Sequence, residues 1–71
     1  MMLYRFGCRE IEAAGYDAQC ELLKIKFVCD GEIWQYYGVP EDIWYKLREE
    51  TSPDAFFHRF IKGRFKETRI L

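Results

Sequence analysis

The sequence predicts an α+β domain in which a three-stranded antiparallel meander packs against two C-terminal helices, in the order β-β-β-α-α. Apolar and polar residues alternate over 21–29, an Asp-Gly pair follows at 30–31, and apolar residues recur at helical spacing after residue 40. The 71 residues have room for one small domain over 1–71. Its core is expected at about 8–65, between a lead-in segment at 1–7 and a tail at 66–71.

Three strands are expected at residues 10–16, 21–29 and 32–37. The middle strand alternates, with Leu23, Ile25 and Phe27 on one side, which is typical of a strand with one buried face. Asp30-Gly31 is typical of a two-residue hairpin loop, because the type I′ turn needs a positive φ that glycine adopts easily. Such a loop would place Phe27 opposite Trp34, and Ile25 opposite Tyr36.

The alternation assigns each side chain to one of two faces. The first hairpin is expected to pair Ile11 with Phe27, Ala13 with Ile25, and Gly15 with Leu23. The face toward the helices would then carry Ile11, Leu23, Ile25, Phe27, Trp34 and Tyr36. The opposite face would carry Glu12, Tyr16, Leu22, Lys24, Lys26, Val28, Ile33, Gln35 and Tyr37. We therefore expect the rings of Trp34 and Tyr36 to lie in the core rather than to stack on a base.

Two amphipathic helices are expected to cover the apolar face. The first spans about residues 40–50, begins with Pro40, and has an apolar stripe of Ile43, Trp44 and Leu47. The second runs from residue 53 to about residue 62, between an N-cap at Ser52 and a stop at Gly63. Its apolar face would carry Phe56, Phe57, Phe60 and Ile61, with His58, Arg59 and Lys62 facing outward.

Charge is distributed unevenly along a chain whose net charge is only −1, a balance that argues against a dedicated DNA-binding protein. Residues 58–71 hold five cations against Glu67 alone, which makes either a cationic patch or an ordinary solvated helix end. Cys8, Cys20 and Cys29 have no C-x-x-C spacing and a single histidine beside them, so no metal site, cofactor or disulfide framework is expected. With no membrane-spanning run or signal peptide, the cytoplasm is the expected location.

Several short motifs follow one another along the strands: Gly15-Tyr16-Asp17, Leu23-x-Ile25-x-Phe27 and Gly31-x-x-Trp34-x-Tyr36-x-Gly38-Val39-Pro40. A second group falls in the helical half: Leu47 through Ser52, Phe56-Phe57 and Ile61-Lys62. Together, over about residues 8–65, they resemble the KTSC domain. That family is named for the C-terminus of some lysyl-tRNA synthetases and also occurs as a stand-alone bacterial protein. The resemblance implies RNA binding as the suggested function.

The resemblance also marks where this chain departs from the family. The central Tyr-x-Tyr of the family falls on Trp34-Gln35-Tyr36, so that an indole replaces the first phenol. Cys8 stands where serine is common, Asp54 where glycine is common, and His58 where asparagine is common. A role that depends on the usual side chain at these positions is not expected to carry over.

We predict a non-catalytic module that binds RNA, in particular tRNA, by phosphate contact and base stacking. The candidate residues are Tyr16, Lys24, Lys26, Tyr37, Arg59, Lys62, Arg64 and Lys66. One alternative is an ordinary solvent face in which Glu12 pairs with Lys26. Another is a homodimer or a protein partner bound through Leu22, Val28 and Ile33, with no membrane contact. An enzyme is not expected, because no triad pattern is present, although a deep pocket around His58 would revive that alternative.

Overall fold

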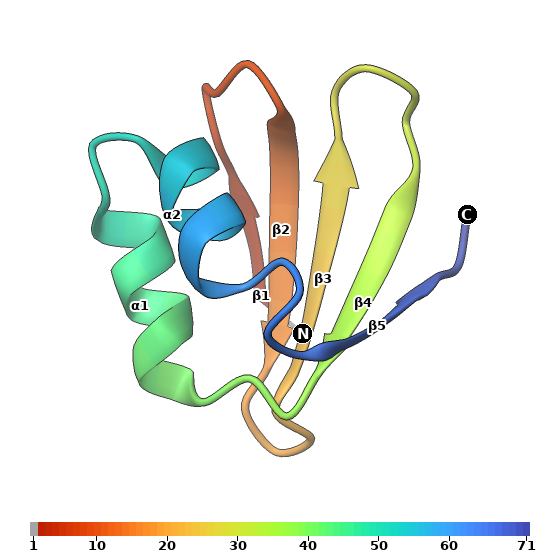
Figure 1. Cartoon of the computed structure of the whole chain (residues 1–71), viewed down its shortest axis with the longest axis vertical. Coiled ribbons are helices and arrows are strands. Elements are labelled where there is room, and N and C mark those ends of the chain that lie inside the picture. Colours follow the sequence, from red (N-terminus) through yellow and green to blue (C-terminus); the bar gives the residue numbers. More distant parts are fainter. Residues whose placement is uncertain (1) are drawn as a thin grey trace.

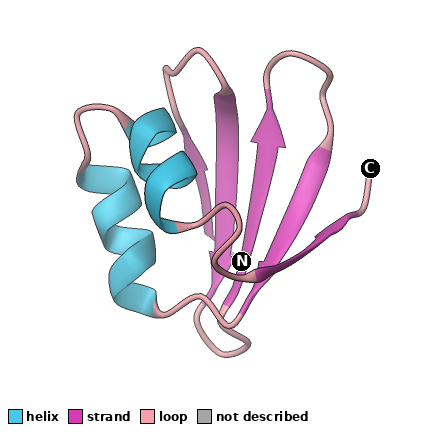
Figure 2. Ribbon diagram, viewed as in Figure 1, coloured by secondary structure: helices cyan, strands magenta, loops and turns pink. Residues whose placement is uncertain are grey.

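The computed structural model describes residues 2–71 as a five-stranded antiparallel sheet with two helices. The elements are β1 (Met2–Arg5), β2 (Ile11–Asp17), β3 (Leu22–Phe27), β4 (Ile33–Tyr37), α1 (Glu41–Glu49), α2 (Pro53–Phe60) and β5 (Lys66–Arg69). The strands lie in chain order, and both helices cover the same face of the sheet (Figures 1 and 2). The α+β class is confirmed, but the predicted three-stranded meander forms only the centre of the sheet. No helix within residues 2–71 is long and apolar enough to cross a membrane.

Both edge strands come from segments that were expected to lie outside the core. β1 lies in the expected lead-in and pairs with β2, with Tyr4 opposite Ala14. β5 lies in the expected tail and pairs with β4, with Arg69 opposite Trp34. The amide of Ile33 also donates to the carbonyl of Leu71 at 3.0 Å. All four residues of β5 are polar and exposed, so the sequence there shows no alternation that could have revealed the strand.

The hairpin between β3 and β4 is longer than the Asp-Gly pair indicated. Ile25 lies opposite Trp34 and Leu23 opposite Tyr36, two residues away from the predicted register. Phe27 donates to the carbonyl of Glu32 at 3.0 Å, so residues 28–31 form the loop. Side chains alternate with a period of two, so a shift of two residues leaves each of them on its predicted face. The prediction that Trp34 and Tyr36 face the helices is therefore confirmed, although the loop was wrong.

A β-bulge in β2 reverses the prediction for Tyr16. Ile11 lies opposite Phe27 as expected, but the register shifts between Ile11 and Ala13, so that Tyr16 pairs with Leu23. The extra residue moves every later side chain of β2 to the other face. Tyr16 is 4% exposed, its hydroxyl donates to the carbonyl of Val39 at 2.6 Å, and its ring stacks on Trp44 at 5.6 Å. The expectation that Tyr16 lies on the solvent face is wrong.

The helices bury nearly the residues that their spacing predicted. Trp44 and Leu47 of α1, with Phe56 and Phe57 of α2, join the core. Phe60 is the exception at 43% exposed, because α2 ends at that residue. Ser52 occupies the N-cap position without a capping side-chain hydrogen bond. Gly63 has a φ of 77° just beyond α2, as expected of the residue that ends a helix.

Candidate functional site

The face of the sheet that the helices leave uncovered carries four cations, on three of its five strands. Residues that pair across strands share a face, so the register identifies its members. Arg5, Ala13, Lys26 and Ile33 form one row across the sheet. Lys24, Gln35 and Thr68 form a second row, and Asp17, Leu22, Tyr37 and Lys66 form a third. We call this surface the open face and define it by its polar and aromatic members: Arg5, Asp17, Lys24, Lys26, Gln35, Tyr37, Lys66 and Thr68.

One lysine of the open face is paired, and the others are not. Lys26 Nζ lies 3.4 Å from Glu12 Oε2, which confirms the pair expected from the sequence. Both side chains are about two-fifths exposed, so water and salt weaken this attraction. Within residues 2–71, Lys24 and Lys66 form no ion pair. The Tyr37 hydroxyl donates to Gln35 Oε1 at 2.9 Å, and the residue is 39% exposed. The face therefore offers free cations beside an accessible ring.

The structure divides the predicted RNA-binding residues among different surfaces. It brings Lys24, Lys26, Tyr37 and Lys66 together on the open face. It places Arg59 on α2, Lys62 and Arg64 in the turns that follow α2, and Tyr16 in the core. Arg5 joins the open face although sequence reasoning missed it. Only recognition of β1 as a strand could have placed Arg5 there, and that segment gave no clear periodicity.

The predicted apolar contact residues do not form a single patch. Leu22 and Ile33 lie on the open face and are half-buried. Val28 is in the hairpin loop, is 46% exposed, and donates its amide to the carbonyl of Glu10. Ile33 lies opposite Lys26, whereas the predicted two-residue loop would have placed it opposite Val28. Exposed apolar surface near Ile33 also belongs to Ile70 and Leu71, which are 44% and 72% exposed.

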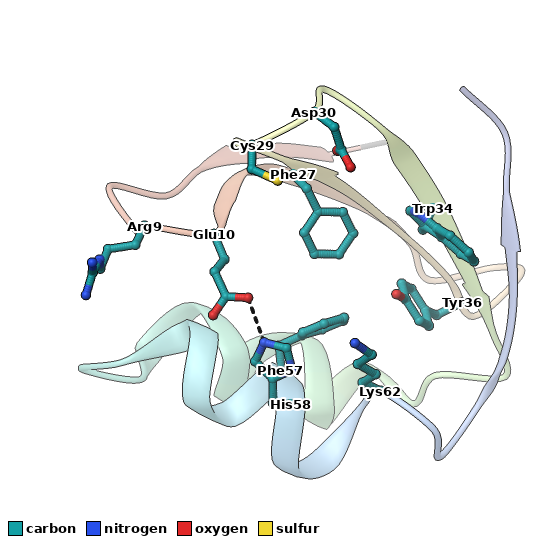
Figure 3. Close-up of a pocket in the computed structure, with 10 residues that line it drawn as sticks. All are labelled: Arg9, Glu10, Phe27, Cys29, Asp30, Trp34, Tyr36, Phe57, His58 and Lys62. Carbon is teal, nitrogen blue, oxygen red and sulfur yellow. Dashed lines mark hydrogen bonds and ion pairs between the residues drawn. The ribbon is translucent and has the colours of Figure 1, made fainter.

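On the other side of the sheet, a cleft of about 240 Å³ lies between α2 and the loop end of β3 and β4 (Figure 3). We call it the aromatic cleft. Its apolar lining consists of Phe27, Trp34, Tyr36 and Phe57. Its polar rim consists of Arg9, Glu10, Cys29, Asp30, His58 and Lys62. Sequence reasoning placed the rings on this face but did not predict a cleft. A cleft forms only if α2 stands far enough from the sheet to leave space between the rings, and the sequence does not give that distance.

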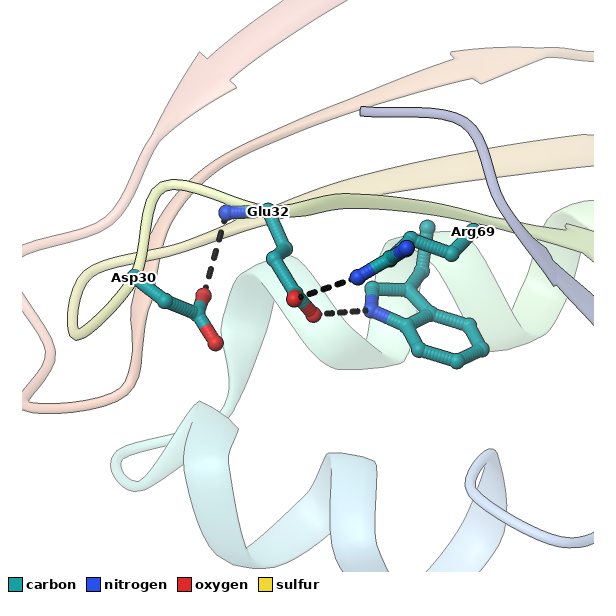
Figure 4. A network of polar contacts seen from close by, with 4 residues as sticks. Asp30, Glu32 and Arg69 are labelled. Atoms are coloured by element: carbon teal, nitrogen blue, oxygen red, sulfur yellow. Dashed lines mark hydrogen bonds and ion pairs between the residues drawn. The ribbon is translucent and has the colours of Figure 1, made fainter.

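The indole of Trp34 is held in place by neighbouring polar groups (Figure 4). Its Nε1 donates to Glu32 Oε1 at 3.1 Å, and Arg69 donates to Glu32 Oε2 at 2.9 Å. Trp34 is half-buried, whereas Tyr36 is 2% exposed. Burial, followed by the nearby Glu67 carboxylate, raises the pKa of Tyr36 above its ordinary value of 10.0, so its hydroxyl is neutral at physiological pH. Of the two rings in the Trp34-Gln35-Tyr36 motif, Trp34 is therefore the more accessible to a ligand in the cleft.

The loop before β2 is fastened to α2 through His58 and Asp54, which stand at two of the positions that depart from the family. His58 Nε2 lies 2.7 Å from Glu10 Oε1, and the Glu10 amide donates to Asp54 Oδ2 at 3.4 Å. Burial, and then the charge of Asp54, raises the pKa of the Cys8 thiol. Cys8 is therefore a neutral thiol near pH 7 rather than an activated thiolate. Among the described residues, His58 has no hydrogen bond to a cysteine, so the cleft beside it shows no activated nucleophile.

The family profile described as KTSC domain matches residues 9–65. The chain belongs to the KTSC domain family. It is similar to a KTSC domain protein of Yersinia pestis of known crystal structure, with a TM-score of 0.93 and 31% identity over 99% of this chain and 97% of that one. It is also 36% identical over 60 residues to a protein of Tsukamurella paurometabola, a match that covers 84% of this chain and 88% of the other.

Two further relatives are much longer proteins. A lysine–tRNA ligase of Nostoc is 36% identical over 60 residues, which is 84% of this chain. A lysine–tRNA ligase of Trichormus variabilis is 31% identical over 55 residues, or 78% of this chain. In each case the matched region is 10% of the ligase, so this KTSC domain corresponds to a small part of those enzymes.

Proposed function

We propose that this KTSC domain is a non-catalytic module that binds RNA, in particular tRNA, through the open face. The observation that carries the proposal is the set of cations Arg5, Lys24, Lys26 and Lys66 on the side of the sheet without helices, where the exposed ring of Tyr37 lies opposite Lys66. The occurrence of a similar segment in lysine–tRNA ligases supports RNA as the polymer.

The open face supplies the two interactions that single-stranded RNA uses. Lys24 and Lys66 would contact phosphates, since neither forms an ion pair within residues 2–71. Tyr37 would stack on a base, an interaction worth about 1–3 kcal/mol in related sites. Gln35 and Thr68 lie between the cations and can form hydrogen bonds to sugars or base edges. With few cations and a net charge of −1, binding is expected to be weak and sensitive to salt.

The direct test is a titration of fluorescently labelled single-stranded RNA and of tRNA at several salt concentrations. Each phosphate contact contributes about −0.7 to the slope of log K against log salt for a single strand, so the three cations outside the Lys26–Glu12 pair predict a slope of about −2. A slope near zero, or no affinity at low salt, would remove this proposal. A hydrolytic assay on the same RNA would separate binding from catalysis.

A protein partner or a second copy of the chain is the alternative function. The observation in its favour is the outer edge of β5, which has only β4 as a neighbour in the sheet, close to the half-buried side chains of Leu22 and Ile33. Light scattering at micromolar concentration tests self-association, and a strict monomer would count against it. The three free cysteines suit a reducing cytoplasm, which we propose as the location for either function.

A further inference from the structure

The aromatic cleft differs in chemistry from the open face on the reverse of the same strands. Its wall is made by the rings of Phe27, Trp34 and Phe57, and Figure 3 shows these rings around a common space. Phe27 and Phe57 meet edge to face, with ring centres 5.6 Å apart. The volume of about 240 Å³ is below the roughly 300–1,000 Å³ of sites for drug-sized molecules. The cleft therefore has room for one small ring system.

The rim of the cleft carries charges of both signs, and one of its cations faces the rings. The carboxylate of Glu10 is engaged by His58 at 2.7 Å, and that of Asp30 accepts the amide of Glu32 at 3.0 Å. Among the described residues, Lys62 and Arg9 form no ion pair. Figure 3 shows the amine of Lys62 directed toward the rings and the guanidinium of Arg9 directed away from them. An anionic group beside the bound ring would therefore meet Lys62.

The indole of Trp34, which forms part of the cleft wall, is held in position without a ligand. Glu32 accepts hydrogen bonds from Trp34 and from Arg69, so the carboxylate that holds the indole N–H is itself fixed by β5 (Figure 4). A ligand that packs on this ring loses little free energy in ordering it. The flat faces of indole and phenyl rings favour a flat partner over an aliphatic one.

We propose that the aromatic cleft binds a single nucleotide, whose base packs against Trp34 and Phe27 and whose phosphate contacts Lys62. The aromatic wall and the volume of the cleft fit the base, and the unpaired amine of Lys62 fits the phosphate. The site lies on the opposite side of the sheet from the open face, so it does not rest on the RNA-binding function proposed above. The nucleotide could be free or could be the unpaired end of an RNA.

The two indole groups allow the proposal to be tested by NMR on the unmodified chain. Trp34 lines the cleft, whereas Trp44 is 1% exposed in the core and serves as the internal control. Adenosine monophosphate is expected to shift the Trp34 indole N–H signal and the amides of Phe27 and Lys62. The signals of Trp44 and Lys24 are expected to stay unchanged. Adenosine should bind at the same place with an affinity up to about fivefold lower, the factor for one exposed charge contact.

Two matched variants assign the phosphate contact. Lys62→Gln is expected to weaken adenosine monophosphate binding by up to about fivefold and to leave adenosine binding unchanged. Lys46→Gln, on the exposed side of α1, should change neither. The proposal is overturned if about 10 mM adenosine monophosphate leaves the Trp34 signal in place. It is also overturned if inorganic phosphate alone produces the same shifts with the same affinity, or if all shifts fall on the open face.

Discussion

The two faces of this sheet use the same strands for different purposes. On the side of the helices, Tyr16 and Tyr36 are only 4% and 2% exposed, and rings from both helices pack against them. On the open face, Tyr37 is 39% exposed, and Lys24 and Lys66 are free of ion pairs within residues 2–71. Alternation along β4 alone separates Tyr36 from Tyr37. Adjacent residues of the same type can thus contribute to stability in one case and be available for binding in the other.

The comparison also shows that most of the rings and most of the free cations of the sheet lie on opposite sides. The open face has several cations and one accessible ring, and the aromatic cleft has several rings and one cation directed toward them. Phosphate contact is therefore expected to dominate on the open face, and ring stacking in the cleft. The predictions below test this division, beginning with the largest expected effect.

Removing a ring should affect stability strongly on one face and weakly on the other. Phe57→Ala is expected to lower the free energy of unfolding by about 3–5 kcal/mol, because it opens a cavity in the core. A domain of this size has a total stability of about 4–10 kcal/mol, so the variant would be close to unfolding. Tyr37→Ala should change stability by less than about 1 kcal/mol. Urea denaturation followed by circular dichroism measures both, and equal losses would contradict the division.

Reversing charges on the open face should weaken RNA binding more than reversing charges on the side of the helices. Lys24→Glu combined with Lys66→Glu is expected to weaken RNA binding by at least about tenfold at low salt, because two phosphate contacts become repulsive. The matched pair Lys46→Glu with Arg59→Glu makes the same change of charge on the helices and should have a smaller effect. Fluorescence anisotropy with one labelled RNA measures both. An equal loss in the two pairs would show that net charge, rather than the open face, governs affinity.

Sequence reasoning recovered the elements that contain strong periodic signals. The alternation around Ile25 and the helical spacing around Trp44 and Leu47 predicted the central strands, both helices and the assignment of most side chains to a face. It failed in β2, where one extra residue in a β-bulge decides which face the later side chains occupy. The bulge near Ala13 moved Tyr16 into the core, and nothing in the local composition marks that bulge.

The edge strands and the cleft could not be predicted for a different reason. β5 is a run of four exposed polar residues whose pairing is decided by where α2 returns the chain, not by its own pattern. Arg69 therefore could not be connected with Glu32 and Trp34 from spacing alone. Sequence reasoning identified the lysines of the open face but not the clustering of Lys66 with Tyr37, which depends on that same strand.

The buried hydroxyls on the side of the helices predict a loss of stability in alkali. Burial raises the pKa of both Tyr16 and Tyr36 above 10.0, and carboxylates near each ring add to the shift. The folded chain therefore holds these protons more tightly than the unfolded chain does. The free energy of unfolding is unaffected by these groups below their ordinary pKa and falls as the pH rises above about 10.

Thermal unfolding between pH 7 and pH 11 measures this fall. Tyr36→Phe removes one of the titrating groups and should make the decline less steep, with a change of less than about 1 kcal/mol at pH 7. Glu67→Gln removes a secondary cause of the shift and should act in the same direction to a smaller extent. A decline that is identical in Tyr36→Phe and in the original chain would show that other groups govern alkaline unfolding.

The smallest expected effect concerns the one ion pair of the open face. Glu12→Gln removes the partner of Lys26 and should change stability by less than about 0.5 kcal/mol, since both side chains are largely exposed. The freed lysine becomes available to a phosphate, so RNA binding should tighten by about two- to fivefold, with a slope against salt that is steeper by about 0.7. Glu49→Gln, at the end of α1, changes the net charge equally and serves as the control. If both variants tighten binding to the same extent, the gain comes from net charge alone, and Lys26 does not contact the RNA.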